Sequence, residues 1–139
     1  MQPEWRSRAW PRIVLWGLAY FVIGLVTAAL SRGAGSGPMH QVWRWAAWLL
    51  SAIAFAAQIW YEQVRLGGPA ARTALRAALA VALGGFLLAV AATVHALSLG
   101  RARIAPQLIA LVAWPAMLGV ASFLVAWAAA AVLARKKSG

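Results

Sequence analysis

Apolar residues occur along the chain in four long runs, and charged side chains gather at the ends of these runs. An α-helix rises about 1.5 Å per residue, so roughly 20 residues cross the hydrocarbon core of a bilayer. Each run is long enough for one crossing, which predicts an all-α protein with four membrane-spanning helices. The predicted spans cover residues 13–31, 43–62, 77–99 and 106–130.

The connections between the runs are short and contain helix-breaking residues. Residues 32–41 are rich in glycine, residues 67–69 read Gly-Gly-Pro, and residues 100–103 are sufficient only for a tight turn. Short connections favour antiparallel neighbours. We therefore expect an up-down-up-down four-helix bundle that forms a single membrane domain over residues 1–139.

Composition supports a membrane protein. Of the 139 residues, 64% are hydrophobic and 11% are charged, whereas typical soluble domains have about 45–50% and about 25%. A soluble domain of this size exposes much of its surface to water, which so few charges would not cover. The chain also has no cysteine, which excludes disulfides and thiolate metal sites.

The formal net charge is +11, from 13 basic residues against Glu4 and Glu62. The bases gather at the ends of the apolar runs, where they bind anionic lipid headgroups. No basic stripe is interleaved with stacking aromatic residues, as a nucleic-acid surface requires. The predicted partners are therefore the lipid bilayer and other membrane helices, and not nucleic acid.

The distribution of the bases also predicts an orientation. If both termini lie on one side, that side carries nine of the bases and the other side carries four, namely Arg32, Arg44, Arg101 and Arg103. The positive-inside rule then places both termini in the cytoplasm, with the chain in the cell (inner) membrane. The nine tryptophans fit this arrangement, since several lie near the span ends and would form aromatic belts.

Small residues form a continuous face on the third predicted span. Steps of four and three residues place them on one side of a helix. Lipid provides no hydrophobic force between spans, so close backbone approach at small residues has to supply the packing. We predict that this small-residue face packs against another helix, in this chain or in another subunit. It consists of Ala78, Ala82, Gly85, Ala89, Ala92 and Ala96.

Two polar stripes are expected to face each other or a partner protein, because an unsatisfied polar group is costly in lipid. The stripe of the second span consists of Arg44, Ser51, Gln58 and Arg65. The stripe of the first span consists of Trp16, Tyr20, Gly24, Thr27 and Ser31.

Glu62 is the one acidic residue within or beside a predicted span. Arg65 lies three residues further on, at a spacing that favours an ion pair along a helix. Alternatively, Glu62 is a functional carboxylate, since ionisable groups in membranes often serve ion or proton pathways. In that case Ser51 and Gln58 would line the route.

His95 and His40 are expected at a similar depth near the non-cytoplasmic side. A histidine ring is a ligand for haem iron or for a chlorophyll-type pigment, and Ala91 leaves space one turn before His95. The alternative is that both are ordinary interfacial histidines. No other metal site is expected.

No nucleophile, base and acid can be combined into a catalytic set from two acids, two histidines and no cysteine. The sequence thus favours a non-enzymatic protein without a resident cofactor, acting as a subunit or oligomer-forming scaffold of a membrane complex. The alternatives are a small proton-coupled transporter or channel that uses Glu62, and a haem- or pigment-binding protein that uses His95.

Overall fold

The computed structural model describes residues 4–101 and 104–137, and nearly all of these residues are helical. Each of the four α-helices is long and apolar enough to cross a membrane, which confirms the expected all-helical fold with four candidate spans. A π-helical segment, η1 (Tyr61–Arg65), continues the second helix. The α-helices are α1 (Glu4–Gly33), α2 (Pro38–Trp60), α3 (Ala70–Ser98) and α4 (Ile104–Lys137).

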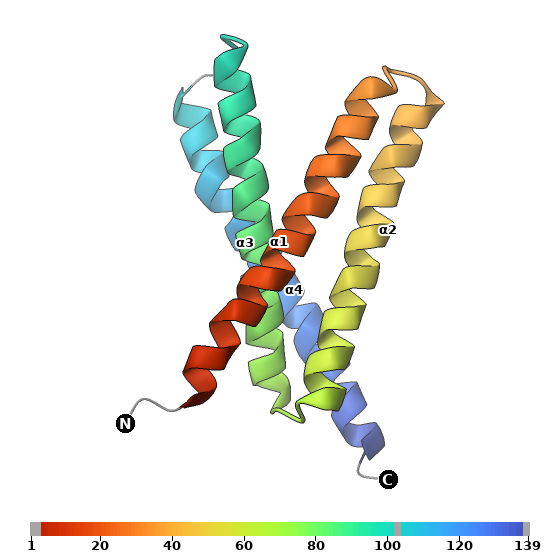
Figure 1. The fold of residues 1–139 in the computed structure, drawn as a ribbon, viewed down its shortest axis with the longest axis vertical. Coiled ribbons are helices and arrows are strands. Elements are labelled where there is room, and N and C mark those ends of the chain that lie inside the picture. The colour runs from red at the N-terminus through yellow and green to blue at the C-terminus, as the bar shows by residue number, and fades with distance from the viewer. Residues whose placement is uncertain (1–3, 102–103, 138–139) are drawn as a thin grey trace.

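The helices form two hairpins that cross in the shape of an X (Figure 1). One hairpin consists of α1 and α2, the other of α3 and α4, and the two ends of the chain lie at the same end of the molecule. Helix α3 packs against both α4 and α1, whereas α2 has limited contact with α3 and α4, and no packing is found between α1 and α4 over the described residues. Helix α3 is therefore the central element.

The α1–α3 crossing depends on two glycines. A Cβ atom added at Gly84 would lie 2.7 Å from the Cβ of Tyr20 and 3.0 Å from the carbonyl oxygen of Gly17. A Cβ added at Gly17 would lie 3.2 Å from the carbonyl oxygen of Ala80. The two backbones approach this closely because neither glycine carries a side chain.

The small-residue face of α3 is divided between two environments. Its first half packs against α4, since a Cβ at Gly85 would lie 2.9 Å from Leu118 Cδ1 and one at Gly119 would lie 3.4 Å from Ala82 Cβ. In its second half, Ala89 and Ala92 line an open groove. The hairpins diverge beyond the crossing (Figure 1), so this part of the face is only partly covered: Ala89 and Ala96 are half-buried and Ala92 is exposed.

Helix α3 ends in a Schellman motif that reverses the chain toward α4. The N–H of Gly100 donates to the carbonyl oxygen of Leu97 at 3.0 Å, and the N–H of Arg101 donates to that of Ala96 at 3.1 Å. Gly100 has φ +65°, which a residue without a side chain adopts at low cost.

The buried apolar core lies toward the end of the molecule that holds the termini. One cluster joins Ile59 of α2 to residues of α3 and α4. A second cluster contains Ile13, Tyr20 and Ala80, and joins α1 to α3. The helices are thus packed together at one end and spread apart at the other.

We expect Gly84→Ala to destabilise the fold by about 1–3 kcal/mol, because the added methyl group would force α1 and α3 apart. Unfolding by sodium dodecyl sulfate in mixed micelles, followed by tryptophan fluorescence, measures this change. Gly33→Ala is the control, since a Cβ at Gly33 meets nothing within 4 Å. An unchanged unfolding midpoint for Gly84→Ala would show that the crossing is not held by close packing.

Candidate functional site

A cluster of buried polar side chains lies where α2 passes into η1. Gln58 is 0% exposed and Glu62 is 2% exposed, and the two residues are about one helical turn apart. Polar groups removed from water need hydrogen-bond partners to offset their desolvation. The partners of these two side chains therefore define the site.

Glu62 pairs with Arg76 of α3 and not with Arg65, the partner that the sequence suggested. Arg76 Nη1 donates to Glu62 Oε2 at 3.1 Å, while Arg65 is exposed. The π-helical turn of η1 (Tyr61–Arg65) accounts for the difference. Its i→i+5 hydrogen bonding widens the turn, so a residue three positions on no longer lies above Glu62.

The polar stripes of the first two spans meet at Gln58. Tyr20 donates its hydroxyl proton to Gln58 Oε1 at 2.9 Å, and both residues are buried. Of the other stripe residues on α2, Ser51 is half-buried and Arg44 is exposed. In this region the two stripes therefore meet through one hydrogen bond, Tyr20–Gln58, at the end of the molecule where the helices pack together.

Two polar atoms of the cluster have no hydrogen-bond partner among the described residues. They are Gln58 Nε2, a donor, and Glu62 Oε1, an acceptor. Leaving buried atoms of this kind unsatisfied costs about 1–3 kcal/mol each. The site therefore retains one donor and one charged acceptor that are available for a further polar group.

Gln63 connects η1 to the start of α3. Its Nε2 donates to the carbonyl oxygen of Gly68 at 3.2 Å, and its Oε1 accepts a hydrogen bond from Thr73 Oγ1 at 3.0 Å. This connection positions the first turns of α3, and hence Arg76, beside Glu62. Sequence reasoning missed both Gln63 and Arg76, although the short connection after η1 indicates that these two helix ends are neighbours.

A groove with a volume of about 710 Å³ lies at the opposite end of the molecule, between α1, α3 and α4. Small and apolar residues form most of its lining, including Ala89 and Ala92. Arg32, His95 and Gln107 contribute polar groups. The groove thus combines an apolar surface with a few polar side chains, as ligand sites commonly do.

The structure assigns the two histidines to different surroundings. His95 lines the groove. His40 is absent from the groove lining, and its Nδ1 lies 2.7 Å from Ser31 Oγ and 3.0 Å from the carbonyl oxygen of Ser31. Over the part of the chain that is described, no group of three or more His, Cys, Asp or Glu side chains could hold a metal ion. His95 is therefore the histidine positioned to meet a ligand in the groove.

No protein-family model matches the chain, and no curated protein or solved structure matches it either.

We expect Arg76→Gln to destabilise the protein by about 3 kcal/mol, because it leaves the Glu62 carboxylate buried without its counter-charge. The matched control is Arg65→Gln, which removes an exposed charge and should change stability by less than about 0.5 kcal/mol. Unfolding in mixed micelles measures both variants. Equal losses in the two would contradict the assignment of Arg76 as the partner of Glu62.

Proposed function

We propose that this protein is a non-catalytic scaffold of a membrane complex, and that it associates with a second copy of itself through one face of α2. The observation that supports this proposal is a helix face that is buried at one end and exposed at the other. Phe55 and Ile59 pack into the core with α3 and α4. One and two turns earlier on the same face, Ala52 and Trp48 are exposed.

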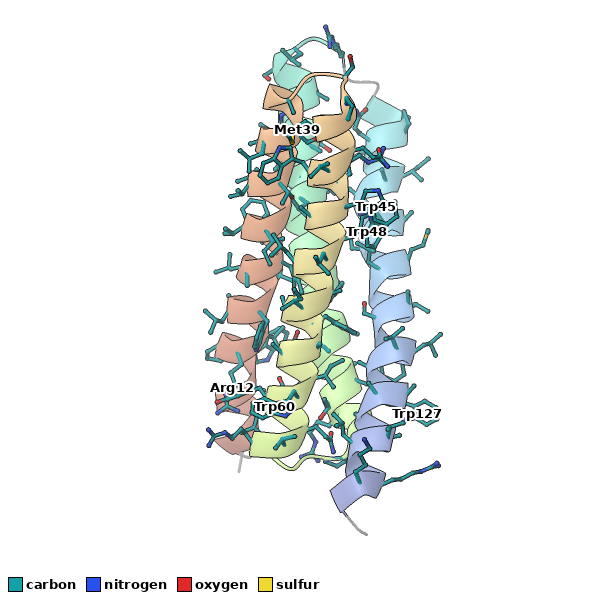
Figure 2. All side chains as sticks on the ribbon, turned by 90° about the vertical axis from the view of Figure 1, so that its right-hand side faces the viewer. Arg12, Met39, Trp45, Trp48, Trp60 and Trp127 are labelled. Atoms are coloured by element: carbon teal, nitrogen blue, oxygen red, sulfur yellow. The ribbon has the colours of Figure 1, made fainter. Side chains whose placement is uncertain are left out.

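The exposed part of this face has the properties of a helix-packing surface. Trp45 is 66% exposed and Trp48 is 67% exposed, and both project from α2 in Figure 2. Ala52 follows Trp48 by one turn and allows a second helix to approach closely, as small residues do in membranes. Large aromatic side chains beside a small residue provide contact area that pairing of two copies would bury.

A two-fold axis would bring this face of α2 against the same face of a second copy. Such isologous pairing is the commonest arrangement in homo-oligomers.

The proposed role is non-enzymatic. The chain has two acids, Glu4 and Glu62, and no cysteine, and these do not combine with its histidines into a catalytic set of nucleophile, base and acid. We further propose that the scaffold crosses the inner membrane four times in an up-down-up-down arrangement, with both termini in the cytoplasm. The excess of bases on the side of the termini supports this orientation.

We expect Trp48→Ala to weaken the dimer by about 30-fold, the equivalent of about 2 kcal/mol for a central aromatic residue. Native mass spectrometry over a concentration series in mild detergent measures the dimer. Trp60→Ala is the control: Trp60 is 52% exposed but lies on another side of α2. A wild-type protein that stays monomeric would refute the proposed association.

Cysteine cross-linking in membranes locates the contact, since the chain has no cysteine of its own. Ala52→Cys should form a disulfide-linked dimer on mild oxidation. Ala57→Cys, at an exposed position on the opposite side of α2, should not. Equal cross-linking of both variants would show that copies collide at random and do not associate through a specific face of α2.

A second candidate function is proton-coupled transport. It is favoured by Glu62 Oε1, which lies in a candidate membrane span and has no hydrogen-bond partner among the described residues. If Glu62 carries protons, liposomes containing the wild-type protein will show a proton flux across the membrane. Glu62→Gln should abolish this proton flux. Glu4→Gln, the same change at the chain's other acid, should leave the flux intact. Absence of flux with the wild-type protein would remove this candidate.

A further inference from the structure

The groove between α1, α3 and α4 lies among helices that are long and apolar enough to cross a membrane. The hydrocarbon core of a bilayer holds almost no water. The apolar part of a groove between such helices therefore favours an apolar group.

The shape of the groove follows from the α1–α3 crossing. Near the crossing, Leu88 fills the space beside Gly24, where an added Cβ would clash with Leu88 Cδ1. Further along, Ala28 of α1 and Ala92 of α3 are too small to close the gap, and both line the groove. The groove volume of about 710 Å³ falls in the range of about 300–1,000 Å³ that is common for ligand sites.

One basic side chain lies in the lining of the groove. It is Arg32, in the last turn of α1, and the imidazole ring of His95 also lines the groove. The chain's two acids are distant, since Glu62 pairs with Arg76 in the cluster at the other end and Glu4 begins α1. The groove therefore attracts an anionic group to the Arg32 end.

Gln107 and Trp114 are two further residues of the lining that have polar groups. The side chain of Gln107 lines the groove, and its Oε1 atom is buried without a hydrogen-bond partner among the described residues. An amide oxygen accepts hydrogen bonds from hydroxyl groups. Trp114, also in the lining, carries the amphipathic ring that favours the headgroup level of a bilayer.

We infer that the groove binds one anionic phospholipid, with an acyl chain over Ala89 and Ala92 and the phosphate at Arg32 and His95. An acyl chain fits the groove better than a partner helix does. The α1 side of the lining runs from Gly24 to Arg32, about 12 Å at 1.5 Å per residue, whereas a spanning helix is about 30 Å long.

The test is native mass spectrometry of the purified protein in an equimolar mixture of phosphatidylglycerol and phosphatidylcholine. We expect one retained phosphatidylglycerol per chain. Arg32→Gln should lower its retention about fivefold, as expected for the loss of one basic contact. The matched control is Arg44→Gln, which removes an exposed base of α2 that does not line the groove and should leave retention unchanged.

A second pair of variants tests the apolar part of the groove. Ala92→Leu should displace the acyl chain and lower retention of both lipids, whereas Ala113→Leu, at an exposed position outside the groove, should not. Circular dichroism confirms that each variant is folded. If Ala92→Leu does not fold, the comparison of Arg32→Gln with Arg44→Gln decides.

Several results would overturn the assignment. They are no lipid retained by the wild-type protein, equal retention of the two lipids, or equal losses in Arg32→Gln and Arg44→Gln. A visible absorption band that His95→Gln removes would place a haem or pigment in the groove instead. No residue of α2 lines the groove, so failure of α2-mediated dimerisation and failure of lipid binding are distinguishable.

Discussion

The close approach of α1 and α3 at Gly17 and Gly84 is the constraint on which the rest of the structure depends. Apolar side chains gain little by leaving lipid for a protein interior, so contact between backbones carries much of the stabilisation. A Cβ at Gly84 would lie 2.7 Å from that of Tyr20, which leaves no space for a larger residue. Contact at one crossing point lets the helix ends diverge, and the two hairpins therefore form an X (Figure 1).

Both candidate sites follow from this geometry. Where the hairpins converge, polar side chains from three helices come within reach of one another, and Gln58, Glu62 and Arg76 find partners there. Where the hairpins diverge, Ala89 and Ala92 of α3 line an open groove. The exposed face of α2 at Trp48 has the same origin, since α2 and α4 meet only to a limited extent. Self-association and lipid binding are thus two proposed ways of covering surface that the crossing leaves open.

The outcome for individual residues shows what local pattern can predict. Spacing along a helix correctly placed Tyr20 and Gln58 on faces that meet, because both helices are regular there. The same reasoning assigned Arg65 to Glu62, and this was wrong, because the π-helical turn changes which side chains align. Arg76, the actual partner, is 14 residues away in sequence. The two histidines share a predicted depth, but only His95 lines the groove.

The sequence by itself determined that the chain is helical, that four segments are apolar enough to cross a membrane, and which residues share a helix face. These properties depend on composition and on the 3.6-residue repeat, which are local. The tertiary structure decided how the hairpins cross, where the small-residue face of α3 is covered, and which charge pairs with Glu62. These depend on contacts between residues far apart in the chain, whose positions a helical repeat does not specify.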